Sequence, residues 1–284
     1  MKVPVSVVVI ARNEERNIGK CLRSAATMAE VFVVDSRSDD ATAVIASSLG
    51  AIVIQFEWDG VGPKKKQWSL ENLPFSHDWV LFLDADEELT PELSREIAAI
   101  VAEPGDRAGF FARYDYVFAG RVLRHGHRVH KLILHDRRRS YFPQYPDLGW
   151  ERATEHELHV QPRVQGQVGR LANRIRHEDH DDFFHYFDRH NRYSDWEARL
   201  RIARVLPDPE EAQPGVRKLL KRGFSAIPFK GTVAFLDSYV AKGGVLDGRA
   251  GFDYAVARGV YYWQIGLKMR EQRSGTGTDR VTDG

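Results

Sequence analysis

Two aspartates separated by one residue, Asp84 and Asp86, are the side chains whose chemistry stands out in this 284-residue chain. Carboxylate oxygens are the ligands that Mg²⁺ and Mn²⁺ prefer, and two of them on one turn can share a cation and hold it against a diphosphate. Such a cation neutralises the negative charge that builds up on a departing phosphate group. An Asp-x-Asp pair is also common in surface turns, so the pair alone predicts a metal site only weakly.

Four apolar runs in the first hundred residues predict the strands that position these aspartates. The runs are rich in β-branched residues and alternate with helical patterns, which indicates a mostly parallel central sheet with helices on both faces. Thr90 and Pro91 have the cap-then-proline pattern of a helix start. Another helix is expected to be capped by Asp39 and to end at Gly50. The predicted strands are Val3–Ile10, Val31–Val34, Ile52–Phe56 and Trp79–Leu83.

Polar side chains follow three of these strands directly. Asn13 and Glu14 come after the first strand, and Asp35 ends the second. The aspartate pair ends the fourth. Ligands of open α/β sheets bind at the carboxyl ends of the strands, so we expect these side chains to lie at one edge. A carboxylate there suits the ribose or base of a nucleotide, although Asp35 could simply cap its own turn.

The remainder of the chain has a different pattern. Short aromatic and β-branched segments, such as Phe110–Val117 and Lys131–His135, predict mixed strands between long loops. Phe183 to Val205 is helical in pattern, and three prolines between 207 and 214 mark a linker. We therefore expect a Rossmann-like α/β catalytic domain with a helical carboxyl-terminal extension. The expected divisions are the α/β catalytic domain at 1–205, an amphipathic helical region at 206–270 and a disordered polar tail at 271–284.

The composition is that of a globular protein without a strong charge bias. Hydrophobic residues make up 43%, and 41 basic residues nearly balance 40 acidic ones, so no whole-molecule field indicates a nucleic-acid partner. A single cysteine, Cys21, excludes an internal disulfide and favours a reducing compartment. No stretch is apolar for long enough to span a bilayer, and the opening apolar run lacks a cleavage site. We expect a cytoplasmic protein whose membrane contact, if any, is peripheral.

Three amino-terminal segments carry a family resemblance. Val7 to Glu15, Val33 to Ser36 and Phe82 to Glu87 together resemble the motifs of family 2 glycosyltransferases with the GT-A fold. More narrowly, they resemble the β-1,4-glucosyltransferase branch that builds lipopolysaccharide cores and related bacterial glycans. Softer similarity continues to about Met269, through segments 58–64, 156–157, 189–194 and 243–251.

The resemblance implies an inverting transfer of a hexose from a UDP-sugar, with UDP-glucose as the expected donor, to a lipid-linked or lipopolysaccharide-core glycan. It implies Mg²⁺ or Mn²⁺ at Asp84 and Asp86. The family's His-Glu step corresponds to His156 and Glu157, which makes Glu157 the expected general base. Glu151, Glu155 and Asp147 remain alternatives for that base. The residues expected to line the nucleotide-sugar site are Ala11, Arg12, Asn13, Glu14, Asp35, Lys66, Asp84, Ala85 and Asp86.

Several other charged groups allow two interpretations. The lysines at 64–66 are either a solvated charge run or include one residue, Lys66, that reaches the diphosphate. Relatives often carry a histidine at the place of His177, so His177 could approach the metal or the phosphates. The histidines at 177, 180, 185 and 190 do not have the pattern of a zinc site. Ser36 and Arg37 stand where many relatives have Asp-Gly, which leaves recognition of the base open.

The basic and aromatic segment Val216–Val240 could lie on an anionic membrane or pack on the catalytic domain. The lipid-linked acceptors of the family favour membrane contact.

Two other functional classes are weaker. A nucleotidyltransferase that forms sugar nucleotides needs a Gly-rich basic loop after the first strand, where this chain has Ala11 to Glu15. A non-catalytic binding protein with the same fold is disfavoured by the intact acidic motifs. The glycines of 244–251 lack the βαβ context of a dinucleotide loop.

Overall fold

The computed structural model describes residues 2–60, 62–127, 130–144, 161–177, 182–203 and 229–274. The chain divides into two compact units. The first comprises Met1–Val117, Arg128–Gln144 and Thr154–His180, and the second comprises Phe118–His127, Tyr145–Ala153 and Asp181–Gly284.

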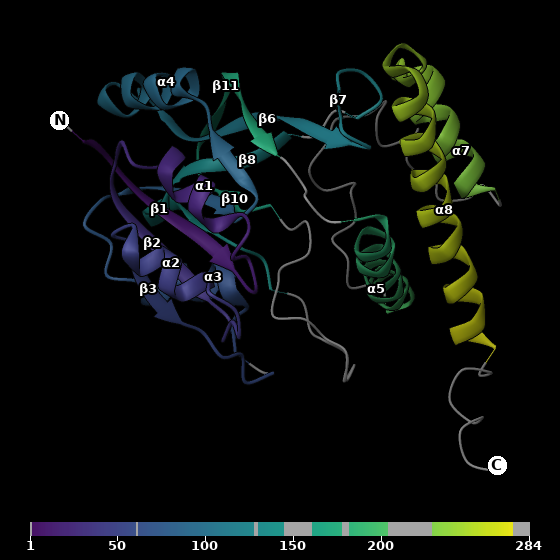
Figure 1. Ribbon diagram of the computed structural model, residues 1–284, viewed down its shortest axis with the longest axis horizontal. Coiled ribbons are helices and arrows are strands. Elements are labelled where there is room, and N and C mark those ends of the chain that lie inside the picture. The colour runs from purple at the N-terminus through teal and green to yellow at the C-terminus, as the bar shows by residue number, and fades with distance from the viewer. Residues whose placement is uncertain are drawn as a thin grey trace. The chain divides into compact units, whose positions relative to one another are not determined.

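A mixed β-sheet forms the centre of the first unit (Figure 1). Its strands are β1 (Val3–Ala11), β2 (Met28–Asp35), β3 (Ile52–Gln55), β4 (Trp79–Asp84), β5 (Glu87–Leu89), β6 (Arg107–Phe118), β8 (His130–Asp136) and β11 (Gln167–His177). They lie in the order β3-β2-β1-β4-β8-β6-β11-β5. The half from β3 to β4 is parallel, as the alternation of strands and helices predicts. The other half is mixed, because β8 runs antiparallel to both β4 and β6 while β11 is parallel to β6 and antiparallel to β5.

Helices cover both faces of this sheet. Consecutive residues of a strand point to opposite faces, and β1 is buried on both, which is why its sequence is continuously apolar. Val7 and Val9 pack in one core cluster, and Val8 and Ile10 in the other. The first cluster includes residues of α1 (Ile18–Ser24), α2 (Thr42–Ser48) and α4 (Pro91–Ala102), and the second is covered by α3 (Lys65–Asn72). The predicted α/β class, with helices on both faces, is confirmed.

The helix ends agree with the sequence patterns at one place and differ at another. Helix α4 starts as predicted, because the Thr90 hydroxyl accepts a hydrogen bond of 3.1 Å from the N–H of Leu93. The prediction of Asp39 as the cap of α2 is wrong. That helix starts at Thr42, and it is Asp40 that accepts the N–H of Thr42 at 2.9 Å.

Short elements complete the first unit. A two-stranded antiparallel ribbon pairs β9 (Ser140–Tyr141) with β10 (Arg163–Val164), and a 3₁₀ turn, η1, covers Arg137–Arg139.

The described part of the second unit is mainly helical. It contains β7 (Arg121–Leu123), α5 (Phe183–Ile202), α7 (Lys230–Leu236), the π-helical turn η2 (Asp237–Ala241), the 3₁₀ turn η3 (Gly244–Asp247) and α8 (Gly248–Arg273). Helix α8 packs against both α5 and α7 (Figure 1). The predicted helical carboxyl-terminal region is therefore present, and α8 continues three residues into the segment predicted as a tail. The predicted boundary at 205 and 206 lies outside the described residues. None of the described helices is both long enough and apolar enough to cross a membrane.

The Gly-rich segment 243–251 has a structural explanation. Gly251 approaches the backbone of η3 so closely that a Cβ there would lie 2.0 Å from the carbonyl oxygen of Gly244. Asp247, at the end of η3, accepts the backbone N–H groups of Arg124, His125 and Gly126 at 2.9–3.0 Å. The glycines therefore allow close packing that lets Asp247 hold the loop after β7.

Candidate active site

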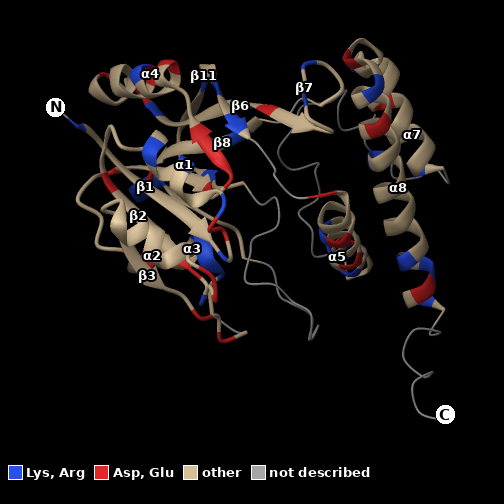
Figure 2. Ribbon diagram, viewed as in Figure 1, with Lys and Arg blue, Asp and Glu red and all other residues tan. Residues whose placement is uncertain are grey.

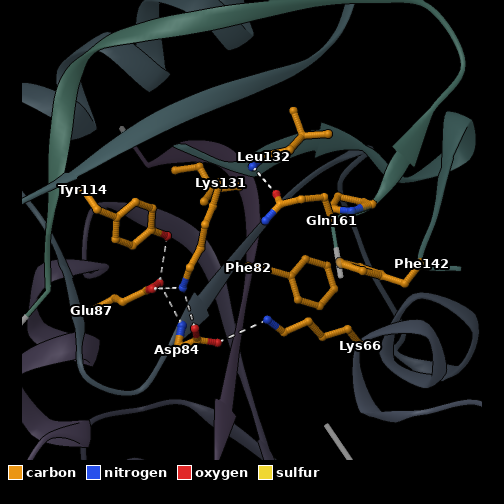
Figure 3. Close-up of a pocket in the computed structure, with 11 residues that line it drawn as sticks. Lys66, Phe82, Asp84, Glu87, Tyr114, Lys131, Leu132, Phe142 and Gln161 are labelled. Carbon is orange, nitrogen blue, oxygen red and sulfur yellow. Dashed lines mark hydrogen bonds and ion pairs between the residues drawn. The ribbon is translucent and has the colours of Figure 1, made fainter. Parts of the chain in front are cut away.

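The carboxyl ends of β1, β2 and β4 meet at one edge of the sheet, as the sequence predicts. Ile10 of β1 lies opposite Asp84 of β4, and Ala11 lies opposite Asp35 of β2. The Asp84 carboxylate is held between two ammonium groups (Figure 3). Its Oδ1 lies 3.2 Å from Nζ of Lys66, and its Oδ2 lies 2.8 Å from Nζ of Lys131.

Lys131 reaches Asp84 because of the antiparallel pairing of β4 with β8. Leu81 lies opposite Leu134 in that pairing, and the same register continued along the strands brings Lys131 opposite Asp84. The ammonium group also lies 2.6 Å from Oε1 of Glu87. Sequence patterns predict the strand of Lys131 but do not reveal this role, because the pairing joins residues far apart in the chain.

Glu87 is a buried acidic group beside Asp84, with a side chain that is 1% exposed. Burial raises the pKa of Glu87, and the ammonium of Lys131 opposes that shift. For Asp84, burial opposes ionisation, but the charges of Lys131 and Lys66 hold its pKa well below the usual range. For Lys131, burial is likewise overcome by Asp84 and Glu87, which raise its pKa well above the usual range. Asp84 and Lys131 therefore form an ion pair.

The second aspartate of the pair has a different partner. Oδ2 of Asp86 lies 3.1 Å from Nε2 of His177, at the end of β11. The ring of Tyr116 stacks on the imidazole, with centroids 5.4 Å apart. Burial opposes the charging of His177, but the Asp86 carboxylate raises its pKa to about 9. Burial also opposes ionisation of Asp86, and His177 lowers its pKa. The prediction that His177 could approach the metal or the phosphates stays a prediction, and the structure places His177 beside Asp86, one of the two predicted metal ligands.

The donor atoms around Asp86 are suited to a divalent cation. Within the described ranges, one group of His and acidic side chains has ligand atoms that all lie within 4.8 Å of one another, and it consists of Asp86, Glu87 and His177. Oxygen and imidazole nitrogen donors fit Mg²⁺ or Mn²⁺. The Nδ1 of His177 is buried and has no hydrogen-bond partner among the described residues. Asp84 is not part of this group, because its carboxylate faces the two lysines.

Asn13, Glu14 and Asp35 tie two loops together beside this edge. The Asp35 side chain is fully buried and accepts hydrogen bonds from the N–H of Ser38 at 3.2 Å and from Nε2 of Gln55 at 2.9 Å. Oδ1 of Asn13 accepts the N–H of Asp39 at 3.1 Å, and the N–H of Glu14 donates to the Thr42 hydroxyl at 2.7 Å. The loop after β1 and the loop after β2 are therefore one hydrogen-bonded unit.

Arg37, in the second loop, has a φ of 54°, the left-handed conformation that favours glycine.

The lysines at 64–66 are not a solvated charge run, so that interpretation is wrong. Lys64 and Lys65 are 4% and 0% exposed. Nζ of Lys65 donates at 3.1 Å to the carbonyl oxygen of Ala11, which also accepts the N–H of Ser36. Lys66 is the member of the run that reaches Asp84. These lysines thus brace the strand end and the aspartate at the same time.

The remaining predicted residues are placed as follows. Ala11 and Ala85 are buried, and Arg12 is exposed. Nδ1 of His185 lies 2.8 Å from Oδ1 of Asp182, and Nδ1 of His190 lies 2.8 Å from the carbonyl oxygen of Tyr186. The predicted base Glu157 and its alternatives at 147, 151 and 155, with His156 and His180, lie outside the described residues.

Comparison with known proteins gives relatives for part of the chain. An uncharacterized glycosyltransferase from Rickettsia bellii (strain RML369-C) is 44% identical over 100 residues, which is 34% of this chain and 33% of that protein. The lipopolysaccharide core biosynthesis glycosyltransferase LpsC from Rhizobium meliloti (strain 1021) is 34% identical over 122 residues, or 41% of this chain and 44% of LpsC. The match thus spans about a third of the first relative and less than half of the second.

One similar solved structure is glucosyl-3-phosphoglycerate synthase from Mycobacterium tuberculosis in complex with Mn²⁺, uridine diphosphate and glucosyl-3-phosphoglycerate. It covers 72% of this chain and 81% of that chain, with 20% identity and a TM-score of 0.43.

The family match is broader than any of these pairwise similarities. The model described as Glycosyl transferase family 2 matches residues 6–156, more than half of the chain. This stretch contains most of β1, the whole of β2 and β4, and the polar residues at the carboxyl ends of these strands. The predicted resemblance is confirmed, and the chain belongs to glycosyl transferase family 2.

Proposed function

We propose that this protein is an inverting, metal-dependent glycosyltransferase that moves a hexose from a UDP-sugar, with UDP-glucose as the first candidate, to a lipid-linked or lipopolysaccharide-core glycan. The observation that carries the proposal is that the two aspartates at the carboxyl end of β4 form ion pairs with different basic side chains. Asp84 faces Lys66 and Lys131, and Asp86 faces His177. The name of the relative LpsC supports the class of acceptor.

On the donor side, Asp86 and His177 would hold Mg²⁺ or Mn²⁺, with Asp84 on the same turn. A divalent cation bound there would neutralise charge on the departing UDP. The ammonium of Lys66 would add a point charge for the diphosphate. The Asp84 carboxylate, 38% exposed, would face the sugar nucleotide. Ala85 completes the turn between the two aspartates.

The nucleoside would lie over the loops after β1 and β2. Arg12 is exposed at the first of these loops and is available for contact. Ala11, Asn13, Glu14 and Asp35 would act mainly by shaping the pocket, since their hydrogen bonds join strand ends and loops. A pocket held rigid in this way orders the donor before the transfer step.

On the acceptor side, Glu157 is the proposed general base. It would take the proton of the acceptor hydroxyl as that oxygen attacks the anomeric carbon from the face opposite the departing UDP, so that the configuration is inverted. The His156-Glu157 step of the sequence supports this assignment.

A peripheral position on the inner face of the cytoplasmic membrane would bring the enzyme to such an acceptor. The predicted membrane segment 216–240 lies mostly outside the described residues, but α8 supports the same idea. Exposed charged residues of α8 lie near its two ends (Figure 2). Between these ends, the exposed positions are spaced three or four apart and carry apolar side chains that are 37–55% exposed. They are Phe252, Val256, Val260, Trp263 and Leu267. We call them the α8 stripe.

The proposed reaction is tested with a panel of nucleotide sugars, by measuring release of the nucleoside diphosphate with Mn²⁺, with Mg²⁺ and with a chelator. We expect turnover of a UDP-hexose that requires the metal and is lost in Asp86→Ala, while circular dichroism remains unchanged. Asp106→Ala, a change in an exposed turn of the same unit, is the matched control and should keep full activity. Full metal-dependent activity of Asp86→Ala would refute the proposal.

A further inference from the structure

Lys131 and Glu87 form an ion pair beside Asp84, and the proposed function gives this pair no role of its own, although Glu87 also lies within the candidate cation group with Asp86 and His177. Nζ of Lys131, from β8, lies 2.6 Å from Oε1 of Glu87, from β5, and 2.8 Å from Oδ2 of Asp84 (Figure 3). Three strands of the sheet thus contribute one charged group each.

Glu87 cannot contact a substrate directly. Its side chain is 1% exposed, and both carboxylate oxygens are used. Oε1 accepts from Lys131, and Oε2 accepts from the Tyr114 hydroxyl at 3.2 Å and from the backbone N–H of Asp84 at 3.0 Å. A carboxylate with three donors from three strands has a fixed position, so Glu87 serves as an anchor.

Lys131 transmits this fixed position to Asp84. Its ammonium lies between Glu87 and Asp84, and 4.6 Å from the centre of the Tyr114 ring. Because Glu87 holds the ammonium of Lys131 in place, the hydrogen bond that this ammonium donates to Oδ2 fixes the orientation of the Asp84 carboxylate. Oδ1 then points to Lys66. The Asp84 carboxylate is 38% exposed, which makes it the most exposed group of this network.

We propose that Glu87 and Lys131 are positioning residues for the sugar-nucleotide site: Glu87 holds the Lys131 ammonium, and Lys131 fixes Asp84. This inference rests on the proposed function, in which Asp84 faces the nucleotide sugar. A carboxylate that is already oriented binds its ligand without a further loss of rotamer freedom. Removal of the Lys131 ammonium leaves the carboxylates of Asp84 and Glu87 without their common partner. Neutralisation of Glu87 removes the charge that holds Lys131, so that Asp84 is then the one carboxylate shared by the ammonium groups of Lys131 and Lys66.

The experiment compares the full chain with Lys131→Met, Glu87→Gln and the double variant Glu87→Gln/Lys131→Met. Glu88→Gln, on the same strand and half-buried, is the matched control. The dissociation constant of UDP in the presence of Mn²⁺ is measured by calorimetry, and the Tm of each protein is measured in parallel. We expect Lys131→Met and Glu87→Gln to raise this dissociation constant about tenfold, as loss of one charge-assisted hydrogen bond implies. Glu88→Gln should leave it unchanged.

The double variant separates positioning from stability. It removes both charges of the pair and leaves side chains of similar size, so its Tm should recover toward that of the unaltered protein. The positioning role requires that UDP affinity stays low in this variant. Recovery of affinity together with Tm would mean that the pair only stabilises the fold, and unchanged affinity in both single variants would likewise overturn the inference. Absence of Mn²⁺-dependent UDP binding in the unaltered protein would instead overturn the proposed function, and this inference with it.

Discussion

Nε2 of His177 lies 3.1 Å from Oδ2 of Asp86, although the two residues are far apart in the sequence. The β11–β6 and β11–β5 pairings bring them together, because His177 lies opposite Tyr116 on one side and opposite Glu87 on the other. If Asp86 and His177 hold the metal, His177→Ala should weaken Mn²⁺ binding by about tenfold or more. Titration of Mn²⁺ followed by electron paramagnetic resonance measures this directly.

His185 provides the control for this prediction, because its side chain is 64% exposed and it lies in the second unit. His185→Ala should bind Mn²⁺ as the unaltered chain does. An equal loss of Mn²⁺ affinity in the two variants would indicate a general effect on folding. Unchanged Mn²⁺ affinity in both variants would show that His177 is not a metal ligand.

The parallel half of the sheet and its acidic edge could be predicted from the sequence for a physical reason. Strands buried on both faces leave continuous β-branched runs, and the polar residue that ends each run marks the strand end. Asp35 and Asp84 were identified in this way. The pattern is local, so it can be read without knowledge of which strands pair.

Lys131 and Tyr114 could not be assigned roles from the sequence, because their positions depend on long-range antiparallel pairing. Lys131 comes opposite Asp84 only through the register of β4 with β8. The burial of Lys65 was missed for a related reason. A run of three lysines is usually solvated, and only the packing of α3 against the sheet provides a carbonyl acceptor at Ala11.

The adjacent lysines 65 and 66 should separate stability from ligand binding. Lys65→Met keeps the length of the side chain but removes the donor to the Ala11 carbonyl, so we expect it to lower the free energy of unfolding by about 1–3 kcal/mol. Lys66→Met should leave stability closer to that of the unaltered chain and weaken UDP binding, because the Lys66 side chain is 22% exposed and lies beside Asp84. Urea unfolding and calorimetry measure the two effects. A larger loss of stability in Lys66→Met than in Lys65→Met, or a larger loss of UDP affinity in Lys65→Met than in Lys66→Met, would contradict these assignments.

The α8 stripe should contribute to binding of an anionic lipid surface. Trp263→Glu places a charge at the stripe residue with the largest exposed fraction, 55%, and we expect about tenfold weaker co-sedimentation with phosphatidylglycerol vesicles. Val44→Glu changes an apolar side chain of α2 that is 71% exposed, and it should have no effect. Unchanged vesicle binding in Trp263→Glu, with a change in oligomeric state, would assign the stripe to a second copy of the chain instead.

His135 should make the fold sensitive to mild acid. The imidazole is fully buried and stacks on Phe82, with centroids 5.6 Å apart. Burial lowers its pKa to about 3, whereas a histidine in the unfolded chain titrates near its usual value of 6.5. The unfolded state therefore binds the proton first as the pH falls. The contribution of the neutral ring to stability is complete above pH 6.5 and decreases by about 1.4 kcal/mol per unit between pH 6.5 and 3.

His135→Phe keeps a ring against Phe82 and removes the titrating group, at the cost of the 2.7 Å hydrogen bond with the Ser140 hydroxyl. Loss of that hydrogen bond lowers the free energy of unfolding by the same amount at every pH. It therefore does not change how the free energy of unfolding depends on pH. Urea unfolding at pH 7.5, 6.5, 5.5 and 4.5 should therefore show the unaltered chain losing stability relative to the variant only below about pH 6.5. Curves that stay parallel down to pH 4.5 would contradict this prediction, because they would mean that the ring takes up its proton in the folded state as readily as in the unfolded chain.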